Sequence, residues 1–406
     1  MIGKENMEKP VAAIEFGSKK LKLVVGYEIG GQVYILYALT KPYGHMIESG
    51  TIVDQQTIAK AINEVRTFSE PSLKLKVSIS EALLALPPYG LEIFQTKQVT
   101  TVLSDEAKIG NIDIRNIYSL IKNGALPLDN QLIDVAPERY ILDQGRSFIK
   151  PPLNETSSTL TVIAKVHTLP KRVAGEYKAA FNAGGLSIKR SIVAPFGACE
   201  LLGSYPDIPN DYLLVDIGSD ITTVSFIGDK ELYASRFFSW GGDRITERII
   251  ESFNINETDA EKYKITYGID TREMAFKTPV CSVDDGQGHE IKHYVDELNA
   301  IIKSELDIFL KELEITLNDL LKGYDPSAKQ LPMILIGGGS HLNGLVEYIE
   351  PKVQSETVKV VSPRTLGARN PTFTNCLGMI LANAKCTNIY DESHPKVTPL
   401  SRDENK

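Results

Sequence analysis

Short β-rich runs and segments with helical spacing alternate along most of the chain. Residues 11–37 contain apolar runs separated by Gly30-Gly31, a pattern that predicts a meander of strands. Apolar positions recur every three or four residues over Thr57–Phe68, Lys171–Ala183 and Asp296–Lys322, which predicts helices. This interleaving of strands and helices indicates an α/β protein.

The remaining predicted elements follow from the same criteria. Strands are predicted at Lys76–Leu86, Ile133–Leu142, Leu160–His167 and Ile188–Val193, and helices at Asp113–Lys122, Asp243–Ile250, Asn256–Gly268 and Phe373–Ala384. We expect Thr258 or Asp259 to cap the start of the helix within Asn256–Gly268, and Asp296 to cap the long helix. Gly184-Gly185 and Gly323 mark helix ends.

Two predicted strand pairs carry the same kind of turn. The run Tyr212–Val215 leads into Asp216-Ile217-Gly218-Ser219 and is followed by a second strand, and Val11–Gly26 (VAAIEFGSKKLKLVVG) repeats this design with Glu15, Gly17 and Ser18. Glycine lets the backbone approach a bulky anion, and successive N–H groups can form an anion-binding concavity. Asp216 could hold a divalent cation or its waters. The two turns are therefore candidate phosphate sites.

A third glycine-rich turn lies far downstream. Leu331–Gly344 (LPMILIGGGSHLNG) is a buried-looking strand that runs into Gly337-Gly338-Gly339 and then a helical pattern. Two acid-x-Gly-Ser hairpins followed by this turn resemble the actin class of nucleotide-binding proteins. The resemblance implies an actin-like, ribonuclease-H-like fold with two domains. In that class the hairpins hold the phosphates from opposite sides, and the glycine turn borders the adenine.

Within this class, several segments over residues 11–385 resemble FtsA, the bacterial cell-division family. They are IDVAPERYILD at 133–143, AGGLSIKRSIVAPFGA at 183–198, SWGGDRIT at 239–246, AEKYKITYG at 260–268 and LGARNPTF at 366–373. The resemblance implies ATP and Mg²⁺ as ligands. It places Gly17, Ser18, Lys22, Gly218 and Ser219 on the phosphates, Asp216 near the metal, Gly241, Gly242 and Asp243 by the ribose, Glu261 and Lys264 by the ribose and adenine, and Gly337, Gly338 and Gly339 beside the adenine.

Two positions depart from the family pattern in ways that affect hydrolysis. Glu15 stands where the family has Asp, and Ala194 stands where many relatives have Glu or Ser. A carboxylate displaced by one methylene still supplies charge, but a misplacement of about an ångström costs on the order of a hundredfold in rate. We expect at most a slow ATPase, with Glu15 and Asp216 as candidates for positioning the metal and water.

The resemblance also implies a division into parts. The first domain core comprises 11–86 and 168–205, and the closing helix at 373–385 returns to it. The second core comprises 206–253 and 324–372. An inserted subdomain is expected at 87–167, a peripheral subdomain at 254–323 and a polar tail at 386–406. The expected protein polymerises, links the FtsZ ring to the membrane and recruits division proteins at the septum, on the cytoplasmic side. Its partners would be itself, the FtsZ C-terminal peptide near Lys303, and other division proteins at 87–167.

Three other classes of actin-fold protein are alternatives. A pilus-assembly relative shares the fold. A sugar or acetate kinase of this fold needs a general base that we do not find, and a chaperone needs a substrate domain after residue 385. The segment His289-Glu290-Ile291-Lys292-His293 fits the zinc motif H-E-x-x-H, in which the two imidazoles share one face of a helix. Its context favours a strand, on which the two imidazoles lie about 13 Å apart, and this argues against a zinc site.

Composition and charge limit the remaining functions. The net charge of −8, with no basic cluster interleaved with aromatic residues, argues against nucleic acid. The four cysteines are scattered, which is typical of a reducing compartment. No apolar run approaches the roughly 18 residues of a membrane span. The tail at 386–406 lacks the amphipathic helix of the family, so this chain alone is not expected to bind membranes.

Overall fold

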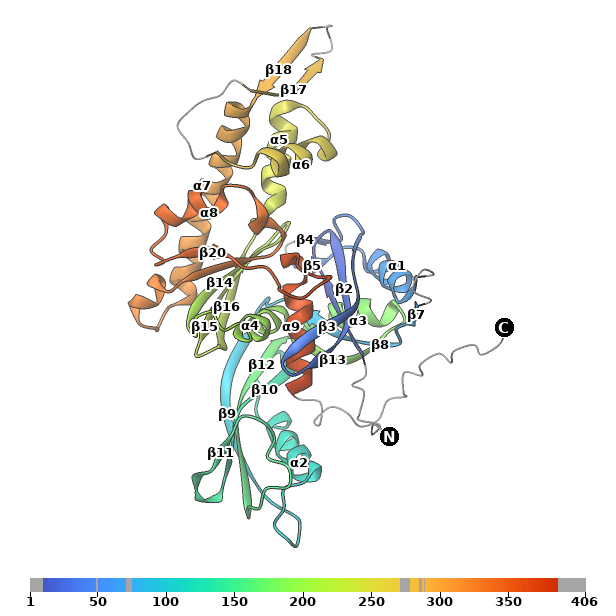
Figure 1. The fold of residues 1–406 in the computed structure, drawn as a ribbon, viewed down its shortest axis with the longest axis vertical. Coiled ribbons are helices and arrows are strands. Elements are labelled where there is room, and N and C mark those ends of the chain that lie inside the picture. The colour runs from blue at the N-terminus through green and yellow to red at the C-terminus, as the bar shows by residue number, and fades with distance from the viewer. Residues whose placement is uncertain are drawn as a thin grey trace, which may run out of the picture.

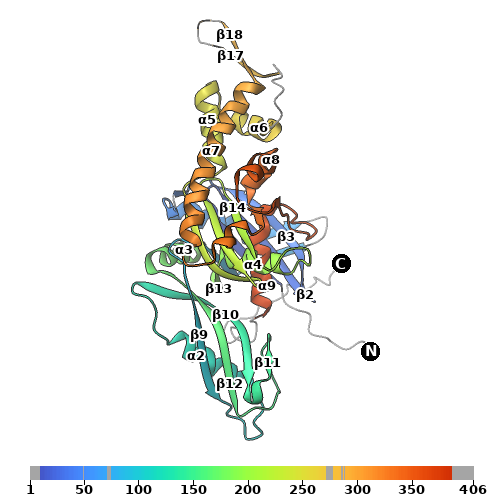
Figure 2. The same cartoon turned by 90° about the vertical axis from the view of Figure 1, so that its left-hand side faces the viewer.

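Two five-stranded sheets lie side by side at the centre of an elongated molecule in the computed structural model (Figure 1). The structure describes residues 10–48, 50–70, 75–270, 278–284, 287 and 289–385. A four-stranded sheet extends from one end of the long axis, and a group of helices with a two-stranded hairpin extends from the other (Figures 1 and 2).

The first central sheet has the strand order β13-β8-β1-β2-β3. The strands are β1 (Val11–Phe16), β2 (Lys20–Ile29), β3 (Gln32–Pro42), β8 (Glu81–Leu86) and β13 (Ser187–Val193). β1 is antiparallel to β2 and parallel to β8. Helices α1 (Gln55–Val65) and α3 (Lys171–Ala183) pack on its outer side. Strand residues such as Leu83 and Leu84 are fully buried, because helices cover both faces.

The second central sheet repeats this arrangement with the order β16-β15-β14-β19-β20. Its strands are β14 (Tyr212–Ile217), β15 (Thr222–Gly228), β16 (Glu231–Phe238), β19 (Met333–Ile336) and β20 (Val358–Val360). β14 is antiparallel to β15 and parallel to β19, as β1 is to β2 and β8. Both sheets therefore begin with a hairpin whose first strand lies in the middle of the sheet.

The long helix α7 (Val295–Leu320) packs against the second sheet and continues to the upper end of the molecule. Its buried stripe includes Leu298, Ile302, Leu306, Phe309 and Leu313, which matches the spacing in the sequence. Helices α5 (Gly242–Phe253) and α6 (Glu257–Tyr267) lie beside it, and the hairpin of β17 (Pro279–Asp284) and β18 (Glu290–Tyr294) projects beyond them (Figure 2).

The four-stranded sheet at the opposite end has the order β11-β10-β12-β9. It consists of β9 (Glu92–Thr101), β10 (Asn130–Leu142), β11 (Ser147–Phe148) and β12 (Thr159–Pro170), with helix α2 (Asn111–Lys122) on one face. Its core includes Ile114, Ile117, Tyr118 and Tyr140. The chain enters this sheet after β8 and leaves it directly into α3. The smaller elements are β4 (Ile47–Glu48), β5 (Thr51–Ile52), β6 (Thr67–Glu70), β7 (Leu75–Ser78), α8 (Leu345–Ile349) and short 3₁₀ turns that include η4 (Gly338–His341) and η6 (Pro371–Phe373).

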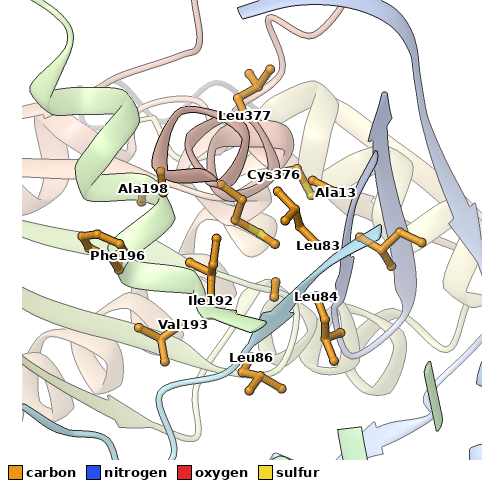
Figure 3. Packing of buried hydrophobic residues seen from close by; sticks show 14 of the residues in the cluster. Ala13, Leu83, Leu84, Leu86, Ile192, Val193, Phe196, Ala198, Cys376 and Leu377 are labelled. Atoms are coloured by element: carbon orange, nitrogen blue, oxygen red, sulfur yellow. The ribbon is translucent and has the colours of Figure 1, made fainter. Parts of the chain in front are cut away.

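Helices α4 (Ala194–Gly203) and α9 (Thr374–Lys385) cross between the two central sheets. Figure 3 shows them beside β8, with Ala198 and Cys376 among the packed side chains. The crossing is close because both helices present glycine: a Cβ at Gly378 would lie 1.6 Å from the carbonyl oxygen of Gly197. This helix pair joins the two halves of the molecule.

The structure corrects several predicted boundaries. The helix predicted at Thr57–Phe68 spans Gln55–Val65, and Phe68 instead lies in β6, where its ring stacks on Tyr37. The strand predicted at Lys76–Leu86 is divided into β7 and β8. The cap of α6 is Asn256, whose side chain accepts a hydrogen bond from the Asp259 N–H, and neither Thr258 nor Asp259 is the cap. The cap position of α7 is Tyr294, and Asp296 lies in the first turn.

Candidate functional site

A cavity of about 620 Å³ lies between the two halves of the molecule. Both hairpin turns line it, together with residues of α5, α6, the η4 turn and α9. Of the predicted site residues, the structure brings thirteen to the wall of this cavity: Glu15, Gly17, Ser18, Lys22, Asp216, Gly218, Ser219, Gly242, Asp243, Glu261, Lys264, Gly338 and Gly339. Gly241 and Gly337 directly precede two of these residues in the chain.

The two hairpin turns have matching geometry. The N–H of Gly17 donates to the Lys20 carbonyl oxygen at 2.9 Å, and the N–H of Gly218 donates to the Ile221 carbonyl oxygen at 3.0 Å. In the first ladder Glu15 lies opposite Lys22, and in the second Asp216 lies opposite Thr223. Each turn therefore places a carboxylate two residues before its glycine and points it toward the other half.

Four side chains form a charged cluster at the inner end of the cavity. Lys22 Nζ lies 2.9 Å from Glu15 Oε1. The amide Nδ2 of Asn375 donates to Glu15 Oε1 at 3.2 Å and to Asp216 Oδ2 at 3.1 Å. Asn375 comes from α9, so one side chain connects the acids of the two hairpins. The two halves of the molecule meet at this amide.

Burial and charge act in opposite directions on this cluster. Burial raises the pKa of Asp216, and Glu15 adds to this rise, while Lys22 and the hydrogen bond from Asn375 reduce it. Burial alone lowers the pKa of Lys22, but the charges of Glu15 and Asp216 outweigh burial and leave its pKa raised. The ammonium group therefore stays protonated between two carboxylates. A buried charge of this kind is stable only because it is paired.

The donor set of the cavity suits a cation bound to phosphate. Glu15 Oε2 is buried and has no hydrogen-bond partner among the described residues, so one carboxylate oxygen is available to a metal ion or its water. Carboxylate oxygens and water are the ligands that Mg²⁺ prefers. Gly218 permits the tight turn, since a Cβ there would lie 2.8 Å from the Ile221 carbonyl oxygen. These residues fit MgATP.

The start of α5 is attached to the second hairpin turn. The N–H of Gly242 donates to the Gly218 carbonyl oxygen at 3.0 Å, and the N–H of Asp243 donates to the Ser219 carbonyl oxygen at 2.8 Å. Glycine is required at 241, because a Cβ there would lie 2.3 Å from the Ser219 oxygen. The Gly-Gly-Asp segment thus holds the start of a helix, with its partial positive charge, against the wall of the cavity.

The triple-glycine turn packs against the same hairpin. Gly337 has a φ of +84°, and a Cβ there would lie 2.3 Å from Asp216 Oδ1. A Cβ at Gly339 would lie 2.4 Å from Ile217 Cγ2. Any other residue at these positions would displace the acid or its strand. The turn therefore serves both to shape the cavity and to let Asp216 reach its place.

Glu261 and Lys264 form a network between α6 and α5. Lys264 Nζ donates to the Gly242 carbonyl oxygen at 3.0 Å and to Thr246 Oγ1 at 2.7 Å, and it lies 2.6 Å from Glu261 Oε2. Burial raises the pKa of Glu261, but Lys264 and Thr246 outweigh burial and leave its pKa lowered. Both charged side chains face the cavity, and they also hold the two helices together.

Lys19 and Asn375 are among the cavity residues that sequence reasoning missed. Lys19 follows the Gly-Ser turn and reaches Asp243 and Glu257 on the opposite wall. Asn375 is a buried amide in an apolar helix. The signal for it in the sequence is a polar residue on the apolar face of Phe373–Ala384.

Other predicted features lie outside the cavity. Lys303 is exposed on α7. The H-E-x-x-H string falls on and next to β18, as its context predicted, and His293 Nδ1 lies 2.8 Å from Glu297 Oε2. Among the described residues no cluster of three metal-binding side chains occurs. No helix in that part of the chain is long and apolar enough to cross a membrane. The predicted tail at 386–406 lies outside the described residues.

Comparison with known proteins bears on both family and fold. The family model for cell division protein FtsA matches residues 213–378. Cell division protein FtsA of Enterococcus faecalis is 25% identical, covering 93% of this chain and 84% of that protein. FtsA of Bacillus subtilis is 22% identical, covering 92% and 83%.

Solved structures show the same fold at low identity. A chain of the PilM–PilN type IV pilus biogenesis complex superimposes with a TM-score of 0.59 at 19% identity, over 93% of this chain and 98% of that chain. MreB5 of Spiroplasma citri bound to ADP superimposes with a TM-score of 0.54 at 14% identity, over 93% and 98%. The actin-like two-domain α/β fold predicted from the sequence is confirmed.

Proposed function

We propose that the chain is a member of the FtsA family of actin-like cell-division proteins, and that it binds MgATP and polymerises; the family-model match and the FtsA relatives support this. In this proposal it links the FtsZ ring to the membrane at the division site and recruits other division proteins there. The observation that carries the nucleotide part is the cluster of Glu15, Lys22, Asp216 and Asn375 between two matched hairpin turns.

Each part of the cavity has a role in this proposal. The turns at Gly17-Ser18 and Gly218-Ser219 bind the phosphates through the N–H groups of Ser18 and Ser219, because the Gly17 and Gly218 N–H groups donate within the turns. Lys22 supplies the positive charge. Asp216 and the free oxygen of Glu15 hold the metal through its waters. Asp243, Glu261 and Lys264 lie toward the ribose, and the Gly337–Gly339 turn lies toward the adenine. MgATP supplies a polyanion and a divalent cation that attract both halves of the molecule.

Hydrolysis is slow in this proposal. Glu15 Oε1 is already engaged by Lys22 and Asn375, so its free oxygen is the one group left to position a water on the first hairpin. Its carboxylate extends one methylene beyond that of an aspartate, and no acid stands at Ala194. Backbone groups and Lys22 provide most of the binding energy. ATP therefore acts mainly as a ligand that closes the two halves and favours polymerisation.

Nucleotide binding is tested with Lys22→Met, which keeps the length of the side chain and removes its charge. A charge-assisted contact contributes about 1.5–3 kcal/mol, so the dissociation constant for MgATP should rise by roughly 10- to 100-fold in calorimetry. Lys41→Met is the matched control, because Lys41 pairs with Glu64 at the surface of the first sheet. An unmodified protein that binds no MgATP would refute the proposal.

Polymerisation and the alternative activities are separated by further assays. Electron microscopy with MgATP, with and without lipid, should show filaments. Phosphoryl transfer to sugars or acetate would instead favour a small-molecule kinase. The family matches favour the division role over a role in pilus assembly.

The partner surfaces are also part of the proposal. The FtsZ C-terminal peptide would bind at 254–323 near Lys303, which is exposed on α7. Other division proteins would bind the inserted part at 87–167, which extends from the end of the molecule opposite α5 and α6 (Figure 2). The two surfaces lie at opposite ends of the long axis, so both partners could bind one molecule together.

A further inference from the structure

Lys19 spans the cavity from the first hairpin turn to the opposite wall. Its Nζ lies 2.9 Å from Asp243 Oδ2, at the start of α5, and 2.8 Å from Glu257 Oε1, at the start of α6. His45 Nε2 lies 3.9 Å from the same Asp243 oxygen. One lysine therefore pairs with two carboxylates that belong to two helices of the other half.

The Glu257 end of this contact lies at the solvent side of the cavity. The Glu257 side chain is 61% exposed, whereas Lys19 and Asp243 are 19% and 13% exposed, about as buried as Lys22 and Glu15 at the inner end. Burial lowers the pKa of Lys19, but Glu257 and Asp243 outweigh burial and leave its pKa raised. The hydrogen bond from Lys19 lowers the pKa of Glu257. Lys19 and Glu257 are therefore charged near neutral pH. Burial raises the pKa of Asp243, and the hydrogen bond from Lys19 reduces this rise.

We propose that Lys19 is a positioning residue that closes the mouth of the cavity and sets the rate at which a bound nucleotide leaves. This inference rests on the proposed binding of MgATP. The physical reason is that the two halves cannot separate at the mouth while Lys19 holds Asp243 and Glu257. A nucleotide that leaves must first break both ion pairs.

The expected size of the effect follows from the exposure of the pairs. Exposed ion pairs contribute about 0.2–1 kcal/mol each. Two such pairs correspond to roughly a 2- to 30-fold change in the rate of release. Screening by salt should reduce the effect, because the Debye length is about 8 Å at physiological ionic strength.

A simpler role for Lys19 is to attract the phosphates, and Glu257→Gln distinguishes the two roles. If Lys19 closes the mouth, removal of the Glu257 charge weakens the closure and speeds release. If Lys19 only attracts phosphate, the same change frees its charge and slows release. The two roles therefore predict effects of opposite sign in one variant.

The experiment measures release of fluorescent mant-ADP and mant-ATP by stopped flow from the full chain. Lys19→Met should speed release about 2- to 30-fold, and Glu257→Gln should speed it by a smaller factor. The double variant should fall short of the product of the two factors, because the residues share one contact. Lys41→Met is the matched control, since Lys41 pairs with Glu64 at the surface of the first sheet, does not line the cavity and should leave the rate unchanged.

The outcomes separate this inference from the proposed function. Nucleotide binding with an unchanged release rate in Lys19→Met, or slower release in Glu257→Gln, overturns the closure role alone. If the unmodified protein binds no nucleotide, the proposed function fails. The Lys19–Glu257 contact is then tested by a double-mutant cycle on thermal unfolding without ligand, where a coupling of zero overturns the contact itself.

Discussion

The crossing of α4 and α9 offers a sharp test of how the two halves are joined. In Gly378→Ala the new Cβ would lie 1.6 Å from the Gly197 carbonyl oxygen. Ordinary contacts of this kind are about twice as long, so the helices must move apart by more than an ångström. Gly197 has no free space around it either, because a Cβ added there would lie 2.8 Å from the Asn375 carbonyl oxygen. Neither helix can therefore yield alone.

The expected cost is at the upper end of the range for an overpacked core, about 3 kcal/mol. For a chain of this size we expect the melting temperature to fall by roughly 3–4 °C. The same movement displaces Asn375, which lies one turn earlier on α9 and donates to both Glu15 and Asp216. MgATP affinity should therefore fall together with stability, although residue 378 does not line the cavity.

The assay is thermal unfolding by calorimetry, with and without MgATP. Gly175→Ala is the matched control, because Gly175 lies in α3 and a Cβ there meets nothing within 4 Å. That variant should gain about 0.5–1 kcal/mol, since alanine favours the helix over glycine. If Gly378→Ala is as stable as the unmodified protein, the close crossing of α4 and α9 is wrong.

Four further predictions follow from individual side chains. Asp216→Asn should weaken Mg²⁺-dependent binding of ATP in calorimetry while leaving the Asn375 side chain an oxygen to donate to; a variant whose affinity depends on Mg²⁺ as strongly as that of the unmodified protein would contradict it. Glu15→Asp should leave ATP affinity similar but raise phosphate release, and an unchanged rate would count against the role of side-chain length. Lys303→Glu should weaken binding of an FtsZ C-terminal peptide in fluorescence anisotropy, whereas Lys60→Glu on α1 should not. Burial raises the pKa of Glu231 to about 7, so its contribution to stability is present at low pH and is lost as pH rises through about 7. Glu231→Gln should therefore melt higher than the unmodified protein at pH 8 and match it near pH 4, and the same difference at both pH values would refute this.

The hairpin turns could be predicted from the sequence because their determinants are local. An acid, a glycine and a hydroxyl residue between two β-rich runs specify the turn, and the pairing of Glu15 with Lys22 follows from its length. The helix of α7 was recognised in the same way from its apolar stripe. By contrast, the predicted helix at Thr57–Phe68 ran too far, because Phe68 packs on Tyr37 of another strand.

The contacts that close the cavity could not be predicted in this way. Lys19 and Glu257 are 238 residues apart, and Glu15 and Asn375 are 360 residues apart. No local pattern encodes such a pair, and only the packing of the two halves brings them together. The choice of Asn256 over Thr258 as a helix cap is a smaller case. Three neighbouring residues are all suitable caps, and Asn256 is the one with an extended backbone whose side chain accepts the Asp259 N–H.

The contacts between the halves differ in strength from the inside to the outside, and this order determines how the cavity can open. At the helix crossing, Gly197 and Gly378 are buried in direct contact, so separating the two helices would expose apolar surface to water. At the inner end, Asn375 donates to two buried acids, and hydrogen bonds to charged groups contribute about 1.5–3 kcal/mol each. At the mouth, the pair of Lys19 with the exposed Glu257 contributes less than about 1 kcal/mol. Separation should therefore begin at Lys19 and turn about the α4–α9 crossing, so that a nucleotide can exchange while the inner cluster stays assembled.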